Sequence, residues 1–90
     1  MSPGDRPRLP RGVRLHEDRV RGATVLLGPE IALILDGPGE AILSEVDGAR
    51  DVTAISADLA RRFEAPEAEI VEDVLAFLND LVLRRLVETA

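Results

Sequence analysis

Few side chains in this sequence could carry out covalent or acid–base chemistry. His16 is the only histidine, and cysteine, tyrosine and lysine are all absent, which removes most nucleophiles and Schiff-base chemistry. The three serines, Ser2, Ser44 and Ser56, have no histidine at a spacing typical of a nucleophile and its base. We therefore expect no catalytic residue, and a protein that binds a partner rather than an enzyme.

The acidic side chains do not form a recognisable metal or phosphate site. Glu69, Glu72 and Asp73 fall on the polar face of a predicted helix, where acids usually keep the surface solvated rather than converge on a cation. The segment DGPGE, residues 36–40, has no lysine after its glycines, and its proline removes an amide donor. We expect neither a metal nor a cofactor.

Charge is distributed unevenly along the chain. Residues 1–21 carry six arginines and three acids, whereas residues 22–90 carry five arginines and fourteen acids. Binding of duplex nucleic acid depends on cations that contact phosphates, and the acidic body would repel it. The segment PEAEIVED, residues 66–73, stands where a helix-turn-helix protein needs basic or amide side chains. We expect no nucleic-acid partner, and DNA binding stays the least favoured alternative.

Size and hydropathy indicate one domain outside any membrane. The chain has 90 residues, of which 46% are hydrophobic, which is enough for a single modest core. No apolar run reaches the length of a membrane span, and the N-terminus lacks the apolar stretch of a signal peptide. We therefore expect a cytoplasmic protein without a membrane partner. Residues 1–10 contain three prolines and are expected to form a flexible tail, followed by a folded domain over residues 11–90.

The first half of the domain is predicted to form a small antiparallel sheet. Alternating apolar residues and short connections indicate strands at about 12–17, 23–27 and 30–35. The third is the clearest, because Gly28-Pro29 and Asp36-Gly37-Pro38 bound a short run of aliphatic residues.

Three helices are predicted after the sheet. The first begins near Gly37 and ends at Gly48. The second has Thr53 as its N-cap and runs to about Phe63, burying Phe63 with Ile55 and Leu59; the third begins at Pro66. The order predicts an α+β fold of winged-helix-like type, with a three-stranded antiparallel sheet followed by three helices.

The third helix has an unusually wide apolar face. About eight side chains fall within an arc of roughly 160°, and they are Ile70, Val71, Val74, Leu75, Phe77, Leu78, Leu81 and Val82. Such an arc covers more than one neighbour. It either packs against both the other helices and the sheet, or part of it lines an open groove beside the third strand.

Four segments in this order and spacing resemble the PqqD family of pyrroloquinoline quinone (PQQ) biosynthesis. They are RPRLPRGVRLHED, VLLGPEIALILD, AILSEVDGARDV and DLARRFEAP, and the resemblance covers about residues 6–88. Its most distinctive pieces are Pro29-Glu30, Ala41–Leu43 and Asp47-Gly48 with Arg50. The chain departs from the family pattern at Gly37-Pro38-Gly39, before the first helix, and at Thr24, where many relatives have an aromatic residue.

The resemblance implies a non-catalytic peptide chaperone without a cofactor. Proteins of this family are recognition elements for ribosomally made, modified peptides (RiPPs) and share the winged-helix-like fold. The resemblance implies two partners: the precursor peptide PqqA and the radical S-adenosylmethionine (SAM) enzyme PqqE, which crosslinks a Glu and a Tyr of that peptide. In this fold class the peptide adds a strand to the third strand and lies against the third helix. A recognition module of another RiPP pathway remains an alternative.

An edge strand without lysine or internal proline is open to pairing with a visiting peptide. The predicted peptide-binding residues are the pairing edge and the groove wall: Glu30, Ile31, Ala32, Leu33, Ile34, Leu35, Val71, Val74, Leu75 and Leu78. Alternate residues of the strand point to opposite faces, and the sequence leaves open which set faces the core. It also leaves open whether the protein is a monomer or a homodimer paired through this edge.

Overall fold

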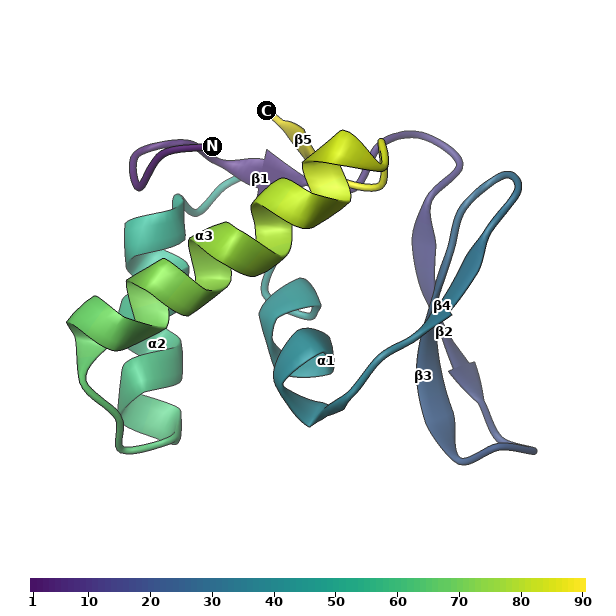
Figure 1. The fold of residues 1–90 in the computed structure, drawn as a ribbon, viewed down its shortest axis with the longest axis horizontal. Helices are drawn as coiled ribbons and strands as arrows, with labels where there is room; N and C mark the ends of the chain where they lie inside the picture. Colours follow the sequence, from purple (N-terminus) through teal and green to yellow (C-terminus); the bar gives the residue numbers. More distant parts are fainter.

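A computed structural model describes all residues, 1–90, and has a three-stranded sheet at one end with helices over the rest (Figure 1). The sheet is antiparallel, in the order β2-β3-β4. Its strands are β2 (Arg14–Asp18), β3 (Ala23–Leu27) and β4 (Ala32–Ile34), and the helices are α1 (Gly37–Leu43), α2 (Val52–Arg62) and α3 (Glu67–Leu83). The predicted α+β order of three strands followed by three helices is confirmed.

Strand β4 is shorter than the segment 30–35 predicted for it. Residues after Leu27 are used for the hairpin turn, which the Gly28 N–H closes by donating to the Ile31 carbonyl at 2.8 Å. Beyond the strand, the Leu35 N–H still donates to the Thr24 carbonyl at 2.9 Å. The ladder therefore continues past the last strand residue, so residues 30–35 still follow the border of the sheet.

Aspartates, rather than the predicted threonine, cap the first two helices. Asp36 accepts a hydrogen bond from the Gly39 N–H at 2.7 Å, and Asp51 accepts one from the Ala54 N–H at 2.8 Å. The prediction that Thr53 caps α2 is wrong, because Asp51 has the extended backbone of an N-cap and Thr53 lies inside the first turn.

Two further boundaries differ from the prediction. Helix α1 ends at Leu43 instead of continuing to Gly48. Phe63 is 56% exposed, although its spacing predicted burial with Ile55 and Leu59. It occupies the C-cap of α2, where the backbone leaves helical geometry and the side chain no longer follows the buried face.

The chain termini form a second, unpredicted ribbon. Strand β1 (Pro7–Arg8) pairs antiparallel with β5 (Glu88–Thr89), so the two ends of the chain lie together (Figure 1). Pro7 is fully buried. Composition could not reveal this pairing, because a two-residue strand leaves no periodic pattern in the sequence.

The first five residues also contact the body. The carbonyls of Asp5 and Pro3 accept hydrogen bonds of 3.0 Å from the N–H groups of Val52 and Thr53, at the start of α2. These N–H groups have no partner within their own helix. The structure therefore packs residues 1–8 against the domain, while the flexibility expected for residues 1–10 stays a prediction.

One hydrophobic core joins the sheet to the helices. Its most deeply buried large side chains come from β3, the three helices and the segment before β5, and include Leu26, Leu43, Ile55, Leu78 and Leu86. None of the helices combines the length and apolar composition needed to cross a membrane.

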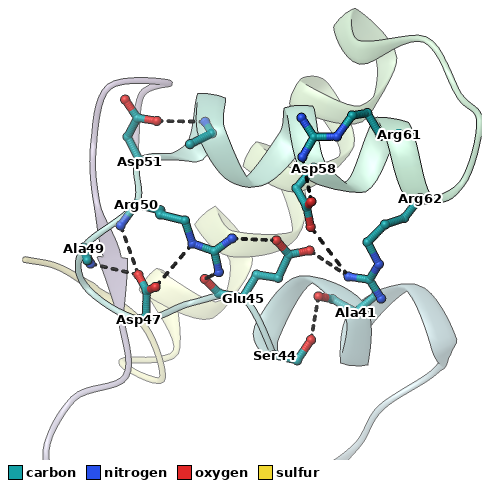
Figure 2. Close-up of polar contacts among 11 residues, drawn as sticks. Ala41, Ser44, Glu45, Asp47, Ala49, Arg50, Asp51, Asp58, Arg61 and Arg62 are labelled. Carbon is teal, nitrogen blue, oxygen red and sulfur yellow. Dashed lines mark hydrogen bonds and ion pairs between the residues drawn. The ribbon is translucent and has the colours of Figure 1, made fainter.

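The Asp47-Gly48-x-Arg50 motif is a structural link between α1 and α2 (Figure 2). Asp47 accepts hydrogen bonds from the N–H groups of Arg50 and Ala49, at 3.0 and 2.9 Å, which holds the pKa of Asp47 below its usual value. The Arg50 guanidinium then reaches Glu45 at 2.9 Å. Arg62 of α2 contacts the same carboxylate at 2.8 Å.

Candidate functional site

The outer border of β4 is vacant. Strand β4 pairs with β3 only and forms one edge of the sheet. The Ile31 carbonyl and the Leu35 N–H bond toward β3, and by the alternation of an antiparallel ladder Leu33 does the same. Ala32 and Ile34 therefore direct their N–H and C=O groups outward, where no hydrogen bond from another part of the chain meets them.

The structure decides which face of β4 is core. Leu33 and Leu35 are partly buried and pack against the hydrophobic core, whereas Ala32 is exposed and Ile34 is 58% exposed. The core-facing set is therefore the one containing Leu33. The side chains that anchor the strand belong to the same residues whose main chain pairs with β3.

A surface groove runs between β4 and the C-terminal half of α3. Two adjoining hollows, both bordered by Arg84, form it, and we call them together the β4–α3 groove. The first hollow is lined by Leu33, Ile34, Leu35, Asp36, Phe77, Asp80, Leu81 and Arg84. The second is lined by Pro29, Glu30, Ile31, Arg84, Arg85 and Leu86.

The helix side of the groove is not the set predicted from the sequence. Val74 and Leu78 are 1% and 0% exposed, belong to the core and line neither hollow of the groove. Val71 and Leu75 are partly buried and line neither hollow of the groove. Val74 instead borders a separate apolar hollow between α1, α2 and α3, which residues of β4 do not line.

Phe77 and Leu81 are the apolar side chains of α3 that face β4. Both fall in the wide apolar arc seen in the sequence, but nothing in the helical period distinguishes them from Val74 and Leu78. The choice depends on where the sheet docks along α3. The predicted strand residues, from Glu30 to Leu35, do line the groove except Ala32, whose outward main-chain groups lie at its border.

The charges of the groove are partly neutralised within the protein. Asp80 forms an ion pair of 3.2 Å with Arg84, and Asp36 is held by its bond to the Gly39 N–H. Glu30 and Arg85 have no ion-pair partner. Across the whole chain, no three metal-ligating side chains converge. The groove offers main-chain hydrogen bonds, apolar contacts and three charges that form no ion pair, those of Glu30, Asp36 and Arg85.

Two solved structures have the same fold over nearly the whole chain. The solution NMR structure of the PqqD truncation of Methylobacterium extorquens PqqCD, described as a stand-alone RiPP recognition element, superposes with a TM-score of 0.84 at 44% identity, over 97% of this chain and 93% of that one. The crystal structure of PqqD from Xanthomonas campestris superposes with a TM-score of 0.61 at 36% identity, over 96% of each chain.

Sequence comparison gives the family. The family model described as "Coenzyme PQQ synthesis protein D (PqqD)" matches residues 23–87. A "PqqA binding protein" of Rhizobium meliloti (strain 1021) is 52% identical over 81 residues, covering 90% of this chain and 83% of that protein. This chain belongs to the PqqD family.

A second relative carries the domain inside a larger protein. The "Bifunctional coenzyme PQQ synthesis protein C/D" of Methylorubrum extorquens is 44% identical over 88 residues, which cover 98% of this chain and 24% of that protein. The expected resemblance is thus confirmed. So is the prediction of a protein that is not an enzyme, because the PqqD relatives and structures are described as a binding protein and a recognition element.

Proposed function

We propose that this chain is a peptide chaperone of PQQ biosynthesis that binds the precursor peptide PqqA as an added strand on β4. The observation that carries the proposal is a vacant strand edge beside a groove with an apolar wall. Ala32 and Ile34 supply the outward main-chain groups. Phe77 supplies apolar surface in the groove, and the buried Leu81 lines the groove beside it. Strand addition uses both features at once.

The energetics favour a complex of moderate affinity. Up to four main-chain hydrogen bonds, at roughly 0.5–1.5 kcal/mol each, contribute about 2–6 kcal/mol. A micromolar complex needs about 8 kcal/mol, and binding also has to offset the ordering of the peptide. Apolar side chains of the peptide must supply the remainder, at roughly 1.5–3 kcal/mol for each one buried. Ile34 and the partly buried Phe77 offer the surface for such anchors, above the buried Leu81.

We further propose that the bound peptide is presented to PqqE for modification. The groove is lined by no serine, threonine, cysteine, lysine, tyrosine or histidine side chain, which agrees with a modifying reaction that a second protein carries out. A strand that pairs with β4 on one side keeps its other edge and its flanking residues accessible to that protein.

The test is a titration of isotopically labelled protein with synthetic PqqA. We expect amide shifts concentrated at residues 29–36 and 77–86. Ile34→Pro removes an outward N–H without deleting a bond to β3, a substitution that edge strands tolerate. We expect it to weaken binding at least about tenfold while the thermal unfolding curve stays close to that of the parent protein.

Ile34→Ala is the matched control, because it shortens the same side chain but keeps the N–H. It should lose less affinity than Ile34→Pro. Shifts confined to the N-terminal residues or to the hollow between the helices would contradict the proposal. Equal affinity of Ile34→Pro and the parent protein would contradict strand addition. Sedimentation with and without peptide distinguishes a monomer from a homodimer paired through β4.

A further inference from the structure

Arg85 occupies a backbone position that favours glycine. Its φ is 61°, in the left-handed region, directly after α3. The Leu86 N–H donates to the Leu81 carbonyl at 2.9 Å and the Arg85 N–H donates to the Val82 carbonyl at 3.0 Å. This pair of bonds is a Schellman ending, whose left-handed residue is usually glycine because a Cβ is unfavourable there.

The Arg85 side chain is exposed and has no partner within the protein. It borders the second hollow of the β4–α3 groove, opposite Pro29–Ile31. Neighbouring Arg84 pairs with Asp80, but no ion pair or side-chain hydrogen bond involves Arg85. Glu30 lines the same hollow without forming an ion pair with it.

The helix dipole does not by itself account for this arginine. A cation near a helix C-terminus is favourable, but Arg84 already supplies one at the C-cap of α3. A second cation at the next position, Arg85, adds little further stabilisation to the helix. Its residue also has the unfavourable left-handed backbone geometry. Strained residues that face a binding groove point to a role in that groove.

We propose that Arg85 binds a carboxylate of the docked peptide and thereby sets the register of the peptide along β4. This inference rests on the proposed function. A strand that slips by two residues keeps the same side chains facing the groove, so apolar contacts alone specify register weakly. A guanidinium recognises a carboxylate through two parallel hydrogen bonds. The second hollow has two arginines and one acid, whereas the first has one arginine and two acids, so a carboxylate is favoured at the Arg85 end.

The first experiment compares two glycine substitutions. Glu64 is the only other non-glycine residue with positive φ, at 51°, and it follows α2, where the Ala65 N–H donates to the Ala60 carbonyl. It lines neither hollow of the groove. Both Arg85→Gly and Glu64→Gly should raise Tm by about 4 °C, since each relieves a left-handed side chain.

Only Arg85→Gly should weaken the binding of synthetic PqqA, by roughly tenfold or more. Higher stability combined with lower affinity is a result that a merely structural role of Arg85 would not produce. Arg61→Gln, on α2 and 75% exposed at its side chain, controls for the loss of one positive charge and should leave affinity nearly unchanged.

The second experiment identifies the carboxylate. Each Asp and Glu of synthetic PqqA is changed in turn to Asn or Gln, and the C-terminus is amidated in a further peptide. One of these peptides should bind the parent protein less tightly than unmodified PqqA does. The Arg85→Gln variant should bind that peptide and unmodified PqqA with equal affinity, which is the result expected of a coupled pair. No coupling at any carboxylate would overturn the inference.

The two proposals fail in different ways. If the parent protein does not bind PqqA, or binds it away from β4, the proposed function fails and this inference with it. If the parent protein binds at β4 and both Arg85→Gly and Arg85→Gln bind equally well, the role of Arg85 is overturned and the proposed function stands.

Discussion

Glu45 is the one charged residue that the fold buries, and its ion pair with Arg62 joins the segment after α1 to α2. Its side chain is 8% exposed, and Arg50 and Arg62 contact its two oxygens (Figure 2). Burial raises the pKa of Glu45, and the nearby Asp58 carboxylate raises it further, against the lowering effect of Arg50. Desolvation therefore partly offsets the favourable contacts that the two arginines make with this carboxylate.

Replacing Glu45 should show that shape and hydrogen bonding matter more than charge. Glu45→Ala removes contacts to both arginines and should lower the free energy of unfolding by about 1–3 kcal/mol. Glu45→Gln fills the same space and keeps one of the two acceptor oxygens, although its NH2 group then faces the other arginine, and it should cost less than Glu45→Ala. Urea denaturation at neutral pH measures both values. Equal losses for the two variants would mean that the charge itself holds α1 to α2.

Asp47 should contribute to the loss of stability in acid. The Arg50 and Ala49 N–H groups lower its pKa in the fold, so its contribution is present above the unfolded pKa of about 3.9. That contribution is lost as the pH falls through the lower folded pKa. Asp47→Asn should therefore be less stable than the parent protein at neutral pH and should show a flatter pH dependence below about pH 4. Urea titrations at a series of pH values measure this, and identical slopes would contradict it.

At the scale of elements, the N-terminal segment completes α2. The carbonyls of Pro3 and Asp5 satisfy N–H groups in the first turn of that helix, and β1 then pairs with β5. Proline-rich composition predicts a flexible tail when the chain is considered alone. The carbonyl of proline remains a good acceptor, however, and here it meets donors that would otherwise be left to water.

Deleting residues 2–5 tests the role of this segment. The deletion removes both acceptors but keeps Pro7 and the β1–β5 pairing. We expect the free energy of unfolding to fall by about 1–2 kcal/mol and the amide hydrogens of Val52 and Thr53 to exchange faster. Unchanged stability and exchange would show that residues 1–5 behave as the tail expected from composition.

At the scale of the whole molecule, the two termini pair with each other and leave β4 uncovered. Strands β1 and β5 form their own two-stranded sheet, away from the three-stranded one (Figure 1). Neither β1 nor β5 therefore covers the border of β4. A strand edge without a covering segment is usually protected by lysine, proline or a β-bulge. Residues Ala32–Ile34 include neither lysine nor proline.

Local sequence patterns were sufficient to predict the order of strands and helices and to predict which segment lies at the vacant edge of the sheet. The strand periods, the glycines and prolines between them, and the wide apolar arc of α3 are properties of residues close together in the sequence. For the same reason Glu30–Leu35 could be predicted as the segment along the border of the sheet, and the lack of histidine pairs, cysteine and lysine indicated a protein that binds.

Only the tertiary structure decided which side chains form the groove and how the chain ends are used. Helical periodicity places Val74, Phe77, Leu78 and Leu81 on one arc. The docking of the sheet along α3 makes Phe77 and Leu81 line the groove, although Leu81 is buried like Val74 and Leu78. The β1–β5 pairing joins residues about eighty positions apart. Such contacts depend on where distant elements meet, which no local pattern of residues encodes.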